Sequence, residues 1–333
     1  MYEKSVVLIT GGTGSWGQEL TRQLLLHNPR QIIIYSRNES SQVKMRMELN
    51  DPRLSFCIGD IRDREALVKA CRGVNYVFHM AALKHVPICE EQPIEALKTN
   101  VTGTKNVIDA AIENDVDKVI NVSTDKAVDP ANFYGMTKAI GEKLIVEANV
   151  HSGGTRFVNV RGGNVLGSSG SVVQRFASQL REHRQIRITD KSMVRFFMTP
   201  QSATELLLTA ARQGHGGEIF VMMMPACRIV DLAEVMIEAS GMRDAEIVET
   251  GARPGEKLSE ALLSAFESSH AVIWNNRYYV IFPALNLSNL RQQYASCPSV
   301  QEQPHLSEHE LMTKAQIRRM LEDGGYVPKA VMG

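Results

Sequence analysis

The sequence predicts an α/β protein built on a doubly wound parallel sheet, with a smaller α/β lobe attached. Three observations support this prediction. Short β-branched apolar runs alternate with segments of helical period, a glycine-rich turn directly follows the first run, and polar residues cluster where later runs end. Strand–helix units repeated at this spacing give a parallel sheet with helices on both faces.

The first predicted strand, residues 5–10, leads directly into the turn G-G-T-G-S-W-G and then a helix over residues 18–27. The glycine pattern G-x-x-G-x-x-G lets backbone amides approach a pyrophosphate at a helix N-terminus. A glycine-rich turn is also a common structural device, but the strand before it and the helix after it favour a dinucleotide cofactor. The expected cofactor contacts in this turn are Gly11, Thr13, Gly14, Ser15, Trp16 and Gly17.

The second predicted strand, residues 31–35, indicates which dinucleotide binds. It ends in Ser36-Arg37-Asn38, and no acidic residue stands there to hold a ribose 2′-hydroxyl as in most NAD sites, although Glu39 lies slightly beyond. Ser36 and Arg37 suit a 2′-phosphate instead, so we expect NADP in preference to NAD. The alternative is an ordinary solvated loop.

A third strand is expected over residues 54–58, followed by a polar turn. In this turn Asp60, with Ile61 beside it, could accept a hydrogen bond from the adenine amine of the cofactor. Asp60 could instead cap the next helix, although Asp63 is the better candidate for that cap.

The fourth predicted strand, residues 75–78, leads into Ala81 and Ala82, whose small side chains would let the backbone meet the cofactor ribose. Lys84 and His85 come next, where they could contact an anionic substrate. Surface solvation explains His85 equally well.

A single long helix is expected over residues 90–114, with Asn100 in its middle. An asparagine buried in a helix more often has a local structural role than a chemical one. Further strands over residues 119–122 and 156–160 complete the predicted sheet.

Thr124, Asp125 and Lys126 follow the fifth strand, at the edge where open α/β sheets hold their ligands. A hydroxyl, a carboxylate and an amine would therefore converge on one crevice. Helix capping by Asp125 and a surface salt bridge by Lys126 are the structural alternatives.

Tyr134 and Lys138 stand four residues apart on a helix that begins near Asn132, so both side chains project from one face. A phenol with a pKa of about 10 is a poor base at neutral pH, but a cation beside it lowers that pKa. Such a tyrosine could take a proton from a sugar hydroxyl while a nicotinamide takes the hydride. An isolated Y-x-x-x-K can arise by chance, and the preceding glycine turn makes the functional interpretation stronger.

After residue 165 the pattern changes to a second lobe threaded with returns to the main sheet. Ser307 and Glu310 match a capping box for a last helix that ends near Asp323. The expected domains are residues 1–165 for cofactor binding, residues 166–285 for a substrate lobe interleaved with the main sheet, and residues 286–333 for a C-terminal tail.

The sharpest motif of the second lobe is Arg253-Pro254-Gly255-Glu256-Lys257. An arginine suits a phosphate ligand because its planar fork binds two oxygens at once. A surface pair between Arg253 and Glu256 is the structural alternative.

The glycine pattern, the Y-x-x-x-K pair and the mid-helix asparagine together resemble the extended short-chain dehydrogenase/reductase superfamily, whose members have a Rossmann fold. More narrowly, the chain resembles the UDP-N-acetylglucosamine 4,6-dehydratases, above all the short C5-inverting members that begin pseudaminic-acid-type pathways. The motifs that carry this resemblance run in order from residue 5 to about residue 263: A-A-L-K-H-V-P, S-T-D-K-A, Y-G-M-T-K, G-N-V-L-G-S, I-T-D and G-A-R-P-G-E-K-L.

The resemblance implies a hydro-lyase that uses NADP and acts on UDP-N-acetylglucosamine. Arg253 would pair with the UDP diphosphate, helped by Asn164 and Arg195. The implied catalytic residues are Thr124, Asp125, Lys126, Tyr134 and Lys138, of which the last two also contact the cofactor, and the implied substrate contacts are Lys84, Asn164, Arg195, Arg253 and Glu256.

In the mechanism that the resemblance implies, Tyr134, held by Lys138, removes the C4 hydroxyl proton while the C4 hydride passes to NADP+. Ser123 or Thr124 hydrogen-bonds the same oxygen. The new C4 ketone makes the proton at C5 acidic.

Elimination would follow at C5 and C6. Lys126, as a neutral amine, removes the C5 proton, and Asp125 protonates the C6 hydroxyl, which leaves as water. Hydride then returns to C6, and protonation of C5 from the opposite face gives UDP-2-acetamido-2,6-dideoxy-β-L-arabino-hex-4-ulose. Lys138 and oxidised nicotinamide are expected to lower the pKa of Lys126.

The chain departs from the family pattern at two places near the expected sugar site. The usual R-Y-G-N-V lacks its tyrosine at Gly162, which we expect to enlarge the pocket, and Ser259-Glu260 stands where His-Glu commonly follows G-E-K-L. S-T-D-K also occurs in larger, membrane-anchored retaining relatives, but these generally carry methionine where Tyr134 stands. The inverting group is therefore favoured.

Three other functions stay open at this stage. The enzyme could release the 5,6-ene sugar nucleotide, or it could only epimerise C4. A non-catalytic NADP-sensing protein is the alternative from another class, but it would have no reason to keep an acid–base set.

Composition agrees with a cytoplasmic enzyme of this kind. The 333 residues carry no net charge, so nucleic acid is not an expected partner, and five dispersed cysteines fit a reducing compartment. No run reaches the roughly 18 apolar residues of a spanning helix, and no signal peptide precedes the first strand, so we expect no membrane partner. We expect a homo-oligomer.

Overall fold

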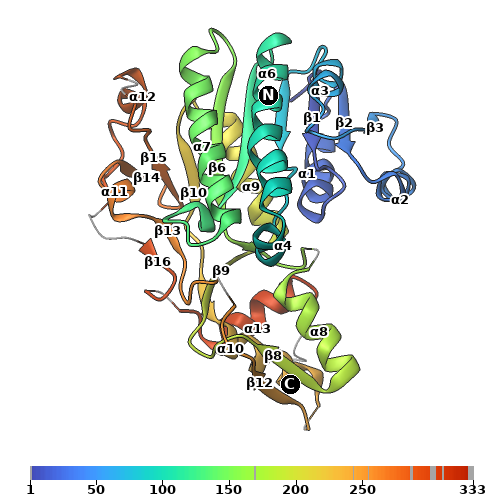
Figure 1. Cartoon of the computed structure of the whole chain (residues 1–333), viewed down its shortest axis with the longest axis vertical. Helices are drawn as coiled ribbons and strands as arrows, with labels where there is room; N and C mark the ends of the chain where they lie inside the picture. The colour runs from blue at the N-terminus through green and yellow to red at the C-terminus, as the bar shows by residue number, and fades with distance from the viewer. Residues whose placement is uncertain are drawn as a thin grey trace.

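The computed structural model describes residues 2–168, 170–242, 244–253, 255–285, 288–300, 305–309 and 311–328. Within these residues, nine strands form one sheet in the order β14-β15-β10-β6-β5-β4-β1-β2-β3 (Figure 1). Its parallel strands are β1 (Val6–Thr10), β2 (Gln31–Ser36), β3 (Leu54–Ile58), β4 (Tyr76–His79), β5 (Lys118–Thr124), β6 (Arg156–Gly162) and β10 (Ile219–Met222). An antiparallel hairpin of β14 (Ala271–Trp274) and β15 (Tyr278–Ile281) closes one edge. The predicted doubly wound sheet is confirmed.

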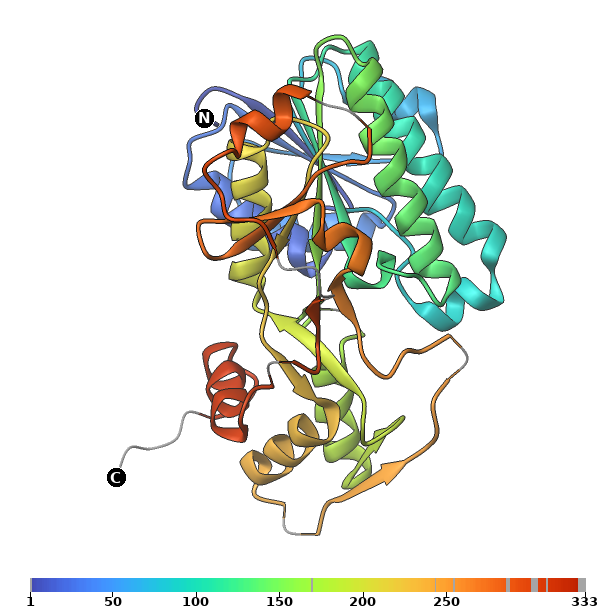
Figure 2. The same ribbon diagram turned by 90° about the vertical axis from the view of Figure 1, so that its left-hand side faces the viewer.

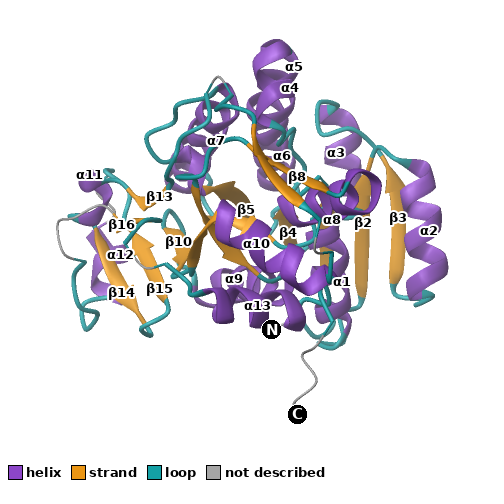
Figure 3. Cartoon of the chain, turned by 90° about the horizontal axis from the view of Figure 1, so that it is seen from below, coloured by secondary structure: helices purple, strands orange, loops and turns teal. Residues whose placement is uncertain are grey.

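Helices cover both faces of this sheet (Figure 3). Successive strand residues point to opposite faces, so Val7 and Ile9 of β1 join one hydrophobic core while Val6 and Leu8 join another. The first core contains residues of α1, α2 and α9, and the second contains residues of α3, α6 and α7. These helices are α1 (Ser15–Leu25), α2 (Glu39–Leu49), α3 (Arg64–Ala70), α6 (Gly103–Glu113), α7 (Phe133–His151) and α9 (Pro200–Gln213).

The single long helix expected over residues 90–114 is wrong. Pro93 has no backbone N–H to continue a preceding helix, and the structure divides the segment there. The pieces are α4 (Val86–Glu91), α5 (Pro93–Leu97), the π-helix η1 (Lys98–Thr102) and α6. Asn100 lies in η1, where its side chain donates to Leu83 O at 2.9 Å and Thr137 Oγ1 at 3.0 Å. This asparagine therefore ties η1 to the loop after β4 and to α7.

A second group of elements, the lower lobe, lies beneath the carboxyl ends of the main strands (Figures 1 and 2). Its strands are β7 (Asn164–Val165), β8 (Gln185–Ile188), β9 (Val194–Met198), β11 (Ala226–Arg228) and β12 (Glu246–Glu249), and its helices are α8 (Val172–His183), α10 (Ile229–Ser240) and α13 (Lys314–Asp323). Phe176, Leu232 and Ile317 belong to its separate hydrophobic core.

The segments that return from the lower lobe pass along one side of the main sheet. They contain β13 (Ala261–Leu263), α11 (Ala265–Ser268), α12 (Ser288–Gln293) and β16 (His305–Leu306), and β13 pairs with β16. The last helix ends where the sequence predicts, but its cap is a box formed by Thr313 and Gln316. Ser307 is buried against β13, and Glu310 lies outside the described residues. In the described part of the chain, no helix has the length and apolar character needed to cross a bilayer.

Candidate active site

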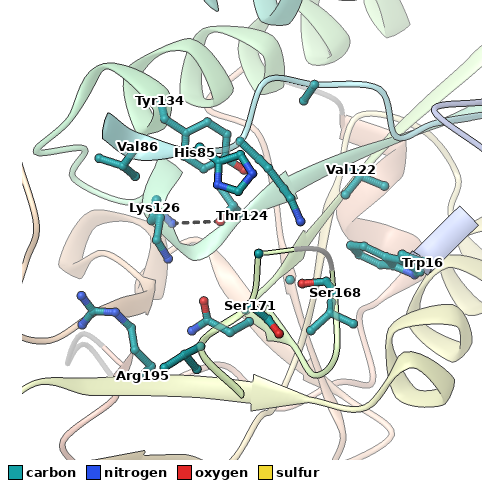
Figure 4. Close-up of a pocket in the computed structure, with 18 of the residues that line it drawn as sticks. Trp16, His85, Val86, Val122, Thr124, Lys126, Tyr134, Ser168, Ser171 and Arg195 are labelled. Atoms are coloured by element: carbon teal, nitrogen blue, oxygen red, sulfur yellow. Dashed lines mark hydrogen bonds between the residues drawn. The ribbon is translucent and has the colours of Figure 1, made fainter. Parts of the chain in front are cut away.

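The carboxyl ends of β1, β4, β5 and β6 border a cavity of about 600 Å³, with the lower lobe on its other side (Figure 4). Asp125 is fully buried behind this wall. Thr13, Ser36, Arg37, Asp60, Ile61 and Arg253 do not line it. The sequence-predicted residues that line it are Gly11, Gly14, Ser15, Trp16, Gly17, Ala81, Ala82, Lys84, Thr124, Lys126, Tyr134, Lys138, Asn164, Arg195 and Glu256.

The glycine turn has the close approaches that a dinucleotide site needs. Gly11 has a φ of +68°, and a Cβ there would come within 2.9 Å of the Ala81 backbone. A Cβ on Gly17 would come within 2.6 Å of Gly12 O, so this glycine lets α1 start close behind β1. Gly14 stands at the N-cap of α1 and offers no side chain to its free amides, which therefore suit a pyrophosphate.

At the end of β2, contacts with neighbouring side chains restrict the two residues that we expected to bind a 2′-phosphate. Ser36 is buried, and Gln42 Nε2 donates to its hydroxyl at 3.0 Å. Arg37 remains largely exposed, with Nη1 3.7 Å from Asp60 Oδ2, while Arg62 Nη2 lies 2.6 Å from the same carboxylate. Asp63 caps α3 as predicted. Of the two predicted 2′-phosphate ligands, Arg37 is therefore the one whose side chain is more accessible to a ligand.

Tyr134 and Lys138 are both buried on α7, which Asn132 caps. Burial raises the pKa of Tyr134 to about 12, although the charge of Lys126 and a hydrogen bond with the Thr124 hydroxyl act in the opposite direction. Burial lowers the pKa of Lys138 to about 8. The sequence predicts that Lys138 lowers the pKa of Tyr134 and so favours its phenolate form. In the structure, Lys126 is the cation that lowers this pKa most.

Lys126 is held between two buried carboxylates. Its Nζ lies 3.0 Å from Asp125 Oδ1 and 3.4 Å from Glu260 Oε1, and the Thr124 hydroxyl also donates to Asp125 Oδ1 at 2.9 Å. Burial alone would lower the pKa of Lys126, but the charges of Asp125 and Glu260 outweigh it and raise that pKa. The expected lowering by Lys138 is therefore wrong, because the prediction did not include Glu260. Lys126 is an ammonium in the resting site.

Glu260 is the acid that sequence reasoning missed as a functional residue. It directly precedes β13, is 3% exposed and lines the cavity. Its signal in the sequence was its place directly after the G-E-K-L-S run, where the chain departs from the family pattern.

The predicted phosphate-binding arginines have different surroundings. Arg195 donates to the main-chain carbonyls of Val194, Lys257 and Leu258, so it holds the segment that leads to Glu260. Arg253 is about half exposed, with Nη1 3.9 Å from Glu256 Oε1.

Arg175 of α8 is a second residue that the sequence analysis missed. It lines the cavity, and its Nε is buried with no hydrogen-bond partner among the described residues. Burial and then the charge of Arg253 lower the pKa of Arg175. Its position in the first turns of an amphipathic helix was the available signal.

Gly162, where the family tyrosine is missing, lines the cavity. A Cβ on Gly162 would come within 3.4 Å of both Trp16 Cη2 and Met198 Sδ, which is ordinary van der Waals contact. The indole ring and the thioether therefore lie beside this glycine. The expectation of an enlarged pocket at this position stays a prediction.

A parallel sheet with a switch in strand order beside β1, a glycine turn at that switch and a Tyr–Lys pair on α7 define the extended short-chain dehydrogenase/reductase class. Within it, the chain belongs to the polysaccharide biosynthesis protein family, whose model matches residues 7–282.

Two relatives of equal identity to this chain are named for different activities. The chain is 44% identical over 289 residues to UDP-N-acetylglucosamine 4,6-dehydratase (inverting) from Campylobacter jejuni, an alignment that covers 86% of this chain and 85% of the relative. It is also 44% identical over 277 residues to a UDP-glucose 4-epimerase from Rickettsia rickettsii, covering 81% of each. Among solved structures it is similar to Pen from Bacillus thuringiensis, with a TM-score of 0.93 and 37% identity over 98% of this chain and 100% of that one.

Proposed function

We propose that this protein is an NADP-dependent UDP-N-acetylglucosamine 4,6-dehydratase that inverts C5. The observation that carries the proposal is the series Tyr134, Thr124 and Asp125, all buried, with the partly buried Lys126 next to them, beside one cavity. A C4 epimerase needs a group that removes and returns the proton of the C4 hydroxyl. It has no use for a carboxylic acid and an amine next to that group.

The diphosphate of the sugar nucleotide would lie between Arg175 and Arg253. The unpartnered Nε of Arg175 and the mutual influence of the two cations both favour an anion in this region. Lys84 lines the same cavity, and burial lowers its pKa, so a nearby phosphate would also stabilise its charged form.

The cofactor would lie along the glycine turn, with its pyrophosphate at the N-terminus of α1. When bound, its nicotinamide would accept two electrons and a proton from C4 and later return them to C6. We assign the 2′-phosphate of NADP to Arg37. Changing Arg37→Ala should weaken NADP binding at least tenfold more than NAD binding, because about 1.4 kcal/mol of a charge-assisted contact corresponds to that ratio. Equal affinity of the parent protein for both dinucleotides, measured by calorimetry, would contradict this assignment.

Tyr134 would act without becoming a free phenolate. Its hydroxyl bonds with Thr124, which in turn donates to Asp125 Oδ1 at 2.9 Å. As Tyr134 accepts the C4 hydroxyl proton, it passes its own proton to Thr124, and Thr124 passes one to Asp125. The pKa of about 12 is then no obstacle, because the proton ends on the Asp125 carboxylate and Tyr134 never carries a negative charge.

The same transfer prepares the elimination. Asp125 now holds a proton that it can give to the departing C6 oxygen. Once Asp125 is neutral, Lys126 loses the partner nearest to its Nζ, so its pKa falls and it can act as the base for the C5 proton.

The test is an NMR time course of the purified protein with UDP-N-acetylglucosamine in deuterated water. We expect a product with one deuterium at C5 and, on its C6 methyl group, a hydrogen that came from C4. A persistent vinylic C6 signal without a methyl signal would show that the reaction ends at the 5,6-ene. Recovery of the C4 epimer alone would refute the dehydratase assignment.

A further inference from the structure

Glu260 lies at the end of the buried acid–base series and has no role in the mechanism described so far. Its Oε1 is 3.4 Å from Lys126 Nζ and 3.8 Å from Arg195 Nε. Its Oε2 is buried and has no hydrogen-bond partner in the described part of the chain. A buried carboxylate with an unsatisfied oxygen is costly, and such groups in native structures need an explanation.

Hydrogen bonds to the backbone around Glu260 fix the position of this carboxylate. Ser307 Oγ accepts from Glu260 N at 3.0 Å, and Ser307 N donates to Glu260 O at 2.9 Å, so Ser307, directly after β16, fixes the backbone of Glu260. Arg195 clamps the carbonyls of Lys257 and Leu258 just before it. These contacts fix the backbone at Glu260 and just before it, so that the Glu260 side chain points toward Lys126.

The charges around Glu260 come from three segments. Lys126 and Asp125 face it from the end of β5, Arg195 faces it from β9, and Lys257 lies on its own segment. Burial raises the pKa of Glu260, and Asp125 acts in the same direction, while the cations oppose them. It is consequently a better proton acceptor than an exposed glutamate.

We propose that Glu260 is the catalytic proton acceptor that converts the resting Lys126 ammonium into the base for C5. This inference rests on the proposed dehydratase function. The geometry supports it because Glu260 Oε1 and Asp125 Oδ1 are the two carboxylate oxygens beside Lys126 Nζ, and Asp125 already carries the C4 proton when the base is needed.

The proton balance closes over the cycle. The N–H bond of Lys126 breaks as an O–H bond forms on Glu260, and the freed lone pair then takes the C5 proton while the C5–H electrons form the enolate. The C6–O bond breaks as the oxygen takes the proton of Asp125 and leaves as water. Lys126 and Glu260 then hold one proton more than at rest. They release it to solvent, and a proton of solvent origin reaches C5 from the opposite face, so the balance closes.

The experiment compares the parent protein with Glu260→Gln, which keeps the shape of the side chain but cannot accept the proton. Stopped-flow absorbance of the reduced cofactor reports C4 oxidation, and NMR in deuterated water reports loss of the C5 proton. We expect C4 oxidation and KM to change less than about threefold while loss of the C5 proton slows at least about a hundredfold. Glu308→Gln, an exposed change next to Ser307, is the matched control and should leave both measurements unchanged.

Equal losses of C4 oxidation and C5 exchange in Glu260→Gln would overturn the inference, because they would indicate a general structural role. Undiminished C5 exchange would overturn it as well. The double variant Lys126→Ala/Glu260→Gln should be no slower than Lys126→Ala alone, because the two groups act in one transfer. The parent protein alone tests the dehydratase assignment, so failure of the two proposals can be told apart.

Discussion

At the scale of single residues, the surroundings of the site residues determine their protonation states. Tyr134 and Lys126 have pKa values raised for different reasons, burial in the first and flanking carboxylates in the second. Neither is ready to act as a base in the resting site. Hydrogen bonds join Tyr134 to Thr124 and Thr124 to Asp125, which pairs with Lys126, so the mechanism that we propose activates the two groups in sequence.

Thr124 should therefore be required as a proton carrier. Thr124→Val keeps the shape of the side chain but removes the hydroxyl that donates to Asp125, and we expect kcat to fall by about 10²–10⁴-fold. Thr124→Ser restores a hydroxyl at the same position and should stay within about tenfold of the parent. Steady-state product formation measures both variants, and equal losses in the two would show that the methyl group matters and the relay does not.

His79 should make the free energy of unfolding depend on pH. It is 1% exposed between Thr10 and Thr104, and burial, assisted by the charge of Lys138, lowers its pKa from 6.5 to about 3. Between these values the unfolded chain binds more protons, so stability is full above pH 6.5 and falls as the pH drops toward 3.

Urea denaturation between pH 6.5 and pH 5 tests this dependence. The parent protein should lose roughly 1.5 kcal/mol more than His79→Gln over that range, since one pKa unit corresponds to about 1.4 kcal/mol. Parallel pH profiles for the two proteins would contradict the assignment to His79.

At the scale of secondary structure elements, one buried ion cluster joins the cofactor-binding sheet to the returning segment. Arg161 on β6 pairs with Glu142 of α7 at 2.8 Å and Glu267 of α11 at 2.9 Å, and it donates to Leu262 O at 2.9 Å. The cluster thus connects the helix that carries Tyr134 to the strand that follows Glu260.

Removing Arg161 should destabilise the fold strongly. Arg161→Met leaves Glu142 buried without its cation, which typically costs about 3–5 kcal/mol. Arg277→Met removes an exposed arginine that pairs with Glu205, and it should cost no more than about 1 kcal/mol. Chemical denaturation measures the free energy of unfolding of both variants, and similar losses would show that burial of the cluster is unimportant. Adding Glu142→Gln to Arg161→Met should recover part of the lost stability.

At the scale of the whole molecule, the cavity is assembled from both parts of the chain. Asn132 Nδ2 donates to Gly255 O at 3.0 Å and Lys257 Nζ donates to Val128 O at 2.8 Å, which join the start of α7 to the segment before Glu260. The turn around Gly167 and Gly170 lies between Tyr326, after α13, and His85, after β4. The C-terminal segment therefore supports a wall of the cavity.

Tyr326→Ala should weaken substrate binding more than catalysis. The ring packs directly on Gly167, and without it the turn that carries Ser168 must be ordered when substrate binds. An ordering cost of about 1 kcal/mol corresponds to roughly a fivefold higher KM for UDP-N-acetylglucosamine with kcat nearly unchanged. Arg319→Ala, an exposed change on α13, is the control, and an unchanged KM in Tyr326→Ala would show that the ring only fills space.

The sequence by itself determined the sheet, the cofactor turn and the Tyr–Lys pair. These features depend on short-range regularities: alternation of apolar runs, glycines at fixed spacing and two side chains four residues apart on one helix. The break at Pro93 is also a local effect, because proline has no N–H to continue the preceding helix.

Only the tertiary structure decided the charge of Lys126, the burial of Glu260 beside it, the approach of Arg175 to Arg253 and the packing of Trp16 beside Gly162. Each of these depends on contacts between segments that are far apart in the chain. The physical reason is that a pKa and the shape of a pocket are set by everything packed around a group, and local sequence spacing does not encode that environment.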